Sequence, residues 1–146
     1  MSHYLFNFSA GGRERASALL RAKMWGVDRQ ERDCDALAPG DLALIYLSAP
    51  EEEFIGRAEL ATAVHNWTLS EAEAFPGDSP TGVLLSYVEQ WDPAVPMATV
   101  VQRIDPSASN PLVQANAAVG FRMGVVRITG DEYEDALALS REIRGT

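Results

Sequence analysis

Two neighbouring stretches of sequence decide the predicted fold. Residues 37–46 have the sequence LAPGDLALIY, and residues 54–60 have the sequence FIGRAEL. Pro39 and Gly40 favour a turn, because proline presets φ and glycine tolerates unusual φ. The run Leu42–Leu47 that follows is almost wholly apolar, which predicts a buried strand.

The second stretch opens a long strand that we expect to cover Phe54–His65. Gly56 lies within it, and a glycine inside a strand favours a bulge or a close approach of another backbone.

The rest of the chain adds strands and helices on both sides of this centre. Alternating apolar residues predict strands at His3–Phe8, Gly82–Trp91 and Gly124–Thr129. Helical spacing predicts helices at Arg13–Met24 and Asp131–Arg144, the second capped by Thr129 or Asp131. The remaining segments are predicted as short or irregular: 28–37, a loop over Asn66–Pro80, a turn at Pro93 and Pro96, a helix or strand over Met97–Ile104, and 105–116. This order excludes a repeated βαβ fold and favours an α+β bent β-barrel of five or six mostly antiparallel strands with flanking helices.

Length and composition are those of one globular domain. The chain has 146 residues, of which 47% are hydrophobic and 23% charged, so we expect a single domain over residues 1–146. One cysteine, Cys34, cannot form an intrachain disulfide, which favours a cytoplasmic protein. We find no signal peptide and no apolar run long enough to span a membrane, so no membrane partner is expected.

The charge is unevenly distributed. The net charge of −9 argues against non-specific nucleic-acid binding. Residues 1–33 hold six basic and four acidic residues, a net of +2, which leaves −11 for the remainder. Two interpretations stay open: a solvated helix face, or a local patch that contacts phosphates on an otherwise acidic body.

The sequence offers no motif for catalysis. His3 and His65 are isolated, and no His, Cys or Asp cluster has the spacing of metal ligands. There is no phosphate-binding loop, dinucleotide fingerprint or nucleophile elbow. We therefore predict no catalytic residue, no metal and no cofactor, which favours a binding module.

The three tryptophans differ in their surroundings. Trp91 ends an apolar strand, so we expect it in the core. Trp25 and Trp67 lie where a regular element ends and a polar loop begins. Aromatic rings at such positions suit a pocket that stacks a nucleobase, and we expect these two indoles to face each other across an open slot.

Several segments resemble a known family. The two central stretches, the opening Tyr4-Leu5-Phe6-Asn7, and Gly124–Thr129 leading into Glu132-Tyr133 resemble EVE domains of the PUA-like superfamily. The resemblance extends to YTH domains, which recognise N6-methyladenine in RNA. There Glu14–Trp25 resembles the helix before the first cage tryptophan, and His65-Asn66-Trp67 the segment that carries the second. Ser109–Asn116 resembles a late Asn-Pro segment. The resemblance implies a PUA-like barrel.

The resemblance also implies a binding site for one flipped base. Its walls would be Trp25 and Trp67 with Phe75 as the floor, and Gly26, Asn7 and Ser9 would contact the base edge. The flanking phosphates would be held by Arg13, Arg15, Lys23 and Arg29. The implied partner is DNA or RNA carrying a modified base, and a nuclease or other effector encoded separately stays open.

The departures from the YTH pattern bear on the base that is bound. YTH domains have Lys-Ser-Asn where this chain has Asn7-Phe8-Ser9, so we expect recognition of a base other than N6-methyladenine. EVE domains are linked to modified bases more generally, including modified cytosines in DNA.

Two alternative functions are kept beside the base-binding module. ASCH domains share the barrel, and some are small amidohydrolases that act on acylated cytidine. Lys23 and Glu59 are the candidate groups for that chemistry here, although Met24 stands where the family's Lys-Thr pair needs threonine. The other alternative is a protein-interaction domain with a degenerate pocket, which the acidic remainder of the chain favours.

Overall fold

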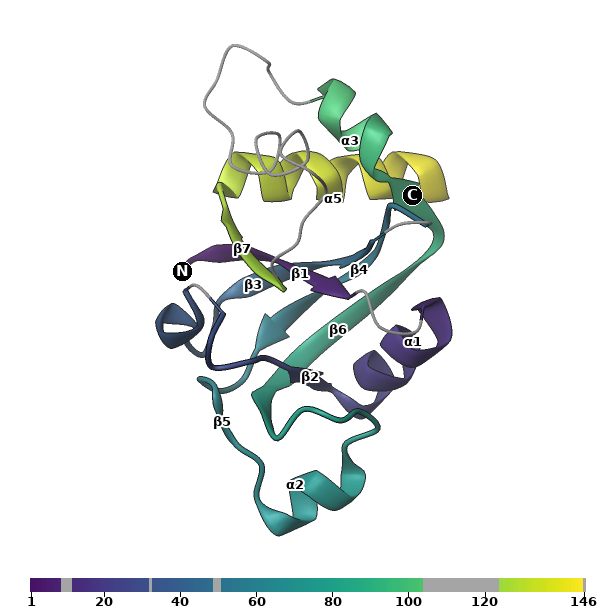
Figure 1. Cartoon of the computed structure of the whole chain (residues 1–146). Helices are drawn as coiled ribbons and strands as arrows, with labels where there is room; N and C mark the ends of the chain where they lie inside the picture. Colours follow the sequence, from purple (N-terminus) through teal and green to yellow (C-terminus); the bar gives the residue numbers. More distant parts are fainter. Residues whose placement is uncertain (9–11, 32, 49–50, 104–123, 146) are drawn as a thin grey trace.

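A strongly curved mixed sheet forms the centre of the molecule (Figure 1). It is seen in a computed structural model that describes residues 1–8, 12–31, 33–48, 51–103 and 124–145. Within these residues the sheet has seven strands in the order β2-β6-β4-β3-β1-β7, and β5 also pairs with β6. The strands are β1 His3–Phe8, β2 Met24–Gly26, β3 Leu42–Leu47, β4 Glu53–Leu60, β5 His65–Asn66, β6 Thr81–Pro96 and β7 Val125–Ile128.

The strand pairing confirms the predicted α+β bent barrel. β1 and β3 run parallel, whereas the other pairs are antiparallel. The strand count is seven rather than five or six, because β2 and β5 are pieces of only three and two residues.

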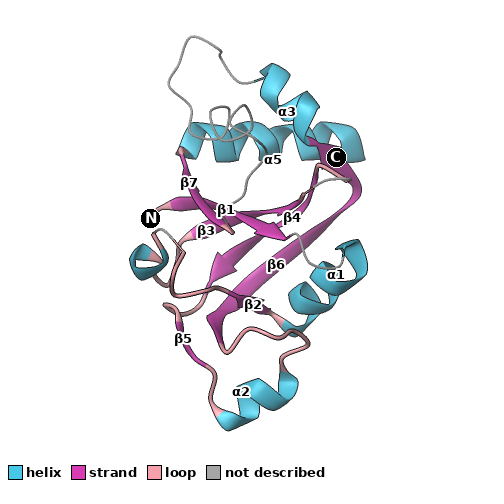
Figure 2. Cartoon of the chain, viewed as in Figure 1, coloured by secondary structure: helices cyan, strands magenta, loops and turns pink. Residues whose placement is uncertain are grey.

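Helices cover both faces of the sheet (Figures 1 and 2). They are α1 Gly12–Ala22, the 3-10 helix η1 Cys34–Ala36, α2 Leu69–Ala74, α3 Met97–Arg103 and α5 Gly130–Arg144. α1 lies beside β2 and β6, α5 and α3 lie together over the other side, and α2 projects at the far end beyond β5.

Alternation along the strands supplies two separate cores. Tyr4 and Phe6 of β1 join the core under α1, while Leu5 joins the core under α5. Successive residues of β3 divide in the same way, with Ile45 in the first core and Leu44 in the second. Since side chains alternate between faces, a strand covered on both faces needs the continuous apolar run predicted at Leu42–Leu47.

Gly56 lies at the predicted close approach. A Cβ on this residue would lie 2.3 Å from the carbonyl oxygen of Glu89 on β6. The register of β4 against β6 shifts between Phe54 and Gly56, so both parts of the prediction are confirmed.

The start of β2 and the end of β4 differ from the sequence predictions. The helix expected at Arg13–Met24 ends at Ala22. Lys23 then takes a positive φ of 57°, because Met24 and Trp25 pair with β6 as strand β2. The long strand expected to reach His65 ends at Leu60.

The predicted loop over residues 66–80 was also wrong in part. It contains α2, whose N-terminus is a capping box between Thr68 and Glu71. The Thr-x-x-Glu spacing is a sequence signal for such a helix start. Pro93 and Pro96, expected in a turn, instead lie within strand β6, where Pro96 pairs with Glu53 of β4. Of the two caps predicted for α5, Thr129 or Asp131, the structure has Thr129. The prediction for 105–116 lies outside the described residues.

Candidate nucleobase-binding pocket

A pocket of about 230 Å³ opens between α1, β2 and the loop that follows α2. Four of its lining residues were predicted contacts of the base: Trp25, Phe75, Gly26 and Asn7. Its full lining is Asn7, Phe8, Arg15, Leu19, Trp25, Gly26, Phe75, Pro76, Gly77, Asp78 and Ser79.

Trp25 belongs both to the pocket and to the core. Strand β2 places its ring against Phe6, with centroids 6.1 Å apart and planes inclined by 18°, and beside the edge of Phe8 at 5.6 Å. Only 3% of the residue is exposed. The ring is therefore held rigidly by aromatic neighbours while it lines the cavity.

Phe75 is held in place by two glycines. A Cβ on Gly77 would lie 2.8 Å from Phe75 Cζ, and one on Gly26 would lie 3.2 Å from the same atom. Real side chains do not tolerate the first distance, so the backbone reaches the Phe75 ring only because these residues lack Cβ.

The position of Trp67 differs from the sequence prediction. It is not among the lining residues, and the expected pair of facing indoles is wrong. β5 pairs with β6 so that His65 lies opposite Gly82, and this register presses the Trp67 ring against Gly82, where a Cβ would lie 2.5 Å from it. Its Nε1 donates to the Ser79 carbonyl oxygen at 2.8 Å, and its ring centroid lies 4.8 Å from that of Phe75.

Trp67 thus supports the wall that Phe75 and Ser79 form. It is itself supported by His65, whose ring meets it edge-on at 5.4 Å. His65 Nε2 lies 3.0 Å from Glu71 Oε1. The pKa of the Glu71 carboxyl is lowered mainly by a hydrogen bond from the Thr68 backbone and, to a smaller extent, by the interaction with His65.

The predicted polar contacts lie partly at the pocket. Asn7 lines it, and its Oδ1 accepts a hydrogen bond from Ser48 Oγ. Ser9 lies outside the described residues. Ser79, which the sequence did not single out, lines the pocket and donates from Oγ to the Thr81 carbonyl oxygen at 2.8 Å.

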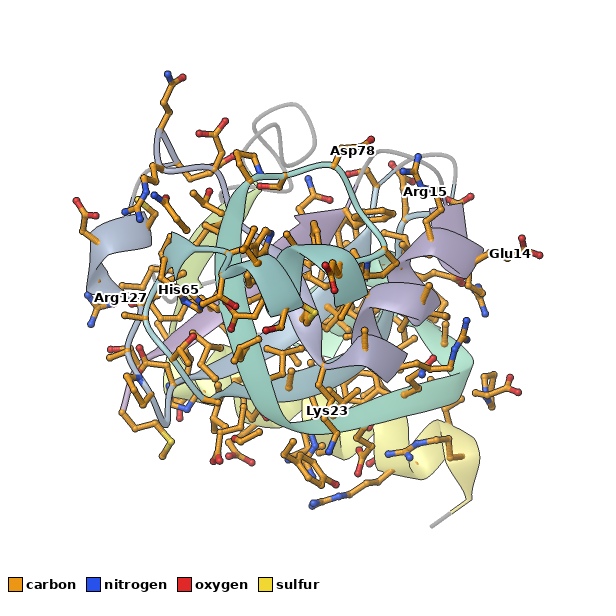
Figure 3. The ribbon with its side chains drawn as sticks, turned by 90° about the horizontal axis from the view of Figure 1, so that it is seen from below. Glu14, Arg15, Lys23, His65, Asp78 and Arg127 are labelled. Atoms are coloured by element: carbon orange, nitrogen blue, oxygen red, sulfur yellow. The ribbon has the colours of Figure 1, made fainter. Side chains whose placement is uncertain are left out.

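The predicted phosphate contacts separate into two groups. Arg15 lines the pocket and its Nη2 lies 3.6 Å from Asp78 Oδ2, as the two labelled side chains in Figure 3 show. Arg13 lies in a hollow beside it and forms an ion pair with Glu53. Arg29 lies in a second hollow and donates from Nη2 to Asn66 Oδ1 at 3.1 Å. Lys23 lines neither the pocket nor the two hollows, and Figure 3 shows it away from the labelled Arg15.

The two hollows adjoin the pocket. The first shares Arg15 and Pro76 with it, and also holds Arg21, which the sequence analysis did not select. The second shares Gly26, Asp78 and Ser79 with the pocket. The pocket is therefore flanked by two hollows, one with Arg13, Arg15 and Arg21 in its lining and the other with Arg29.

The loop residues of the pocket were missed by sequence reasoning. Pro76, Gly77 and Asp78 follow Phe75 directly, and a Pro-Gly-Asp run is a sequence signal for a tight turn. The signal predicts a turn but not its partner, because the contact of this loop with α1 joins residues far apart in the sequence.

Metal-ligand clusters and membrane-spanning helices are both absent from the described residues. No three His, Cys, Asp or Glu side chains among them lie together as metal ligands would. No helix in the same part of the chain has the length and apolar character needed to cross a membrane.

The solved structures similar to this one include three that represent different kinds of protein. Human THYN1 protein, in complex with DNA containing 5-methylcytosine, is 20% identical with a TM-score of 0.65; the match covers 96% of this chain and 98% of that one. The YTH domain of Zygosaccharomyces rouxii MRB1, in complex with N6-methyladenosine RNA, is 13% identical with a TM-score of 0.61, covering 94% and 86%. ASCH from Zymomonas mobilis is 14% identical with a TM-score of 0.54, covering 94% and 95%.

Sequence comparison finds no such relatives: no protein-family model and no curated protein matches the chain. The structural likeness spans nearly the whole chain. The chain therefore shares its fold, a PUA-like bent barrel, with the human THYN1 protein, this YTH domain and this ASCH protein.

Proposed function

We propose that this protein is a nucleic-acid-binding module that holds one flipped, modified base between Trp25 and Phe75 and performs no chemistry on it. The observation that carries the proposal is the pocket of about 230 Å³ with a rigid tryptophan and a phenylalanine in its lining. Two solved structures of the same fold contain a methylated nucleic acid, one DNA and one RNA.

The pocket chemistry suits a neutral planar heterocycle. Stacking of a base on an aromatic side chain contributes about 1–3 kcal/mol. A methyl group buried beside Phe8 and Leu19 would add roughly 0.8 kcal/mol. Asn7 and the backbone of Gly26 would meet the base edge, and Ser9 stays a prediction.

The two hollows that adjoin the pocket suit the strand on either side of the base. Arg13, Arg15 and Arg21 would approach the phosphates on one flank, and Arg29 those on the other. Such contacts position a strand without selecting its sequence, so selection falls to the pocket.

Replacement of Phe75 by Ala tests the proposal. Phe75 is only partly buried, so its loss should leave the fold intact and weaken binding of the modified base by about tenfold, the value of one stacking contact. Fluorescence titration at fixed salt would compare 5-methylcytosine, N6-methyladenine and unmodified oligonucleotides of DNA and RNA. Tyr87→Ala is the matched control, because Tyr87 is an exposed aromatic residue on β6 that is not part of the pocket lining.

Equal affinity of the wild-type protein for modified and unmodified strands would contradict the proposal. Trp25→Ala is unsuitable as the test, since a residue only 3% exposed and packed on Phe6 supports the fold as well.

The amidohydrolase alternative has no support in the pocket geometry. Lys23 and Glu59 are not among the lining residues, and Glu59 Oε2 accepts from Ser86 Oγ at 3.0 Å. Hydrolysis of acylated cytidine that disappears in Lys23→Ala would nevertheless overturn the proposal that the protein is not an enzyme.

A further inference from the structure

Asp78 stands at the mouth of the pocket, where a strand would have to pass. Its side chain is 96% exposed, and the residue lines both the pocket and the hollow that holds Arg29. Its carboxylate lies 3.6 Å from Arg15 across the gap between the loop and α1 (Figure 3).

The loop that carries Asp78 is fixed on both sides. Ser79 Oγ donates to the Thr81 carbonyl oxygen, and the Ser79 carbonyl oxygen accepts from Trp67 Nε1. On the other side, Gly77 packs against the ring of Phe75. The backbone that carries the carboxylate is therefore anchored on both sides, although the exposed ion pair is itself weak.

Arg15 is the cation among the described lining residues of the pocket. A phosphate that approaches the pocket would meet Arg15 already paired with a carboxylate. On the Arg29 side it would also meet Asp28 and Glu31, which line the same hollow.

We infer that the Asp78 carboxylate competes with the phosphates of a bound strand for Arg15. It thereby limits the affinity that the strand's backbone alone can contribute. The inference rests on the proposed function. A phosphate at Arg15 must replace Asp78, so the exchange of one anion for another contributes little net affinity. Binding then depends on a base that enters the pocket, which suits an acidic protein with a net charge of −9.

A double-mutant cycle tests the competition directly. Binding of an unmodified single-stranded DNA and its 5-methylcytosine counterpart would be measured at one low salt concentration with the wild-type chain, Asp78→Asn, Arg15→Gln and the double variant. Asp78→Asn should tighten binding of both strands by about fivefold, the upper range for an exposed ion pair. In the Arg15→Gln background the same change should give less than about twofold, because the two residues act as a pair.

Glu14→Gln is the matched control. It removes the same charge one residue from Arg15, from a side chain that points away from Asp78 in Figure 3, and should change affinity less than Asp78→Asn does. Added salt should reduce the Asp78→Asn effect.

Three results would overturn the inference. Asp78→Asn could raise the affinity equally with and without Arg15, it could leave the affinity unchanged, or neither the wild-type chain nor Asp78→Asn could show measurable strand binding. The proposed function has a separate readout, the affinity ratio of methylated to unmethylated strand for the wild-type chain. A ratio of one together with an Arg15-dependent gain would reject the base-binding proposal and keep the role of Asp78.

Discussion

Trp25 and Trp91 are buried to almost the same degree, with 3% and 2% of each residue exposed, yet they lie in different kinds of surroundings. Trp91 lies in the core under α5. Its Nε1 donates to Glu89 Oε1 at 2.8 Å, and the Arg144 guanidinium lies 5.8 Å from its ring centre. Trp25 lies in the core under α1, but part of its surroundings is a cavity.

The difference comes from what covers each ring. α5 has 15 residues and buries Tyr133, Ala136 and Leu137 over the sheet, and its last turn supplies Arg144. α1 has only 11 residues, and the space beside it is completed by the loop after α2, which meets α1 at the exposed pair Arg15–Asp78. Burial of a ring therefore does not distinguish a core residue from a pocket wall, whereas the covering element does.

The largest expected effect separates stability from binding. Trp91→Ala should lower the free energy of unfolding by about 3–5 kcal/mol, because it leaves a cavity in a closed core. Its affinity for modified strands should stay unchanged at temperatures where the variant is folded. Thermal unfolding followed by titration would measure both, and an affinity loss as large as that of Phe75→Ala would show that the two regions are not independent.

A smaller effect is expected from the carboxylate beside Trp91. Partial burial acts to raise the pKa of Glu89, but hydrogen bonds from Trp91 and Arg57 and the charge of Arg57 outweigh it and lower that pKa from 4.5 to about 2. Glu89→Gln should therefore cost about 3 kcal/mol of unfolding free energy at neutral pH.

The same shift determines the pH dependence. Because the pKa is lower in the folded state than in the unfolded state, the stabilisation is fully present above pH 4.5 and is lost as the pH falls towards 2. Urea unfolding of the wild-type chain and of Glu89→Gln should give curves that converge over this range. A difference that persists undiminished near pH 2 would mean that packing, rather than charge, carries the contribution of Glu89.

The smallest expected effect compares two capping boxes of the same design. Thr129 begins α5 with Glu132, which is fully buried, and Thr68 begins α2, a helix with no buried residue. Thr129→Ala should cost about 1–2 kcal/mol and Thr68→Ala only about 0.5 kcal/mol. Unfolding midpoints measure both, and equal costs would show that α2 contributes to the fold as strongly as α5.

Sequence reasoning located the central strands but misplaced the pocket wall. The structure confirms the buried strand at Leu42–Leu47 and the irregularity at Gly56. Both could be predicted because their local patterns hold in any fold with a sheet covered on both faces. Trp67 has equally clear polar neighbours, yet its ring turns towards Gly82 because β5 pairs with β6. Its loop position was visible in the sequence, but its partner was not.

The sequence by itself determined which segments alternate, the turn at Pro39 and Gly40, and a cap on the last helix at Thr129 or Asp131. These features depend on neighbours within a few residues, so they can be predicted without the tertiary structure. Only the tertiary structure decided that Phe75 rather than Trp67 lines the pocket beside Trp25, and that Arg15 meets Asp78. Those contacts join residues 50 or more positions apart, and they follow from strand register and from the angle at which α1 and the loop after α2 meet, which no local pattern specifies.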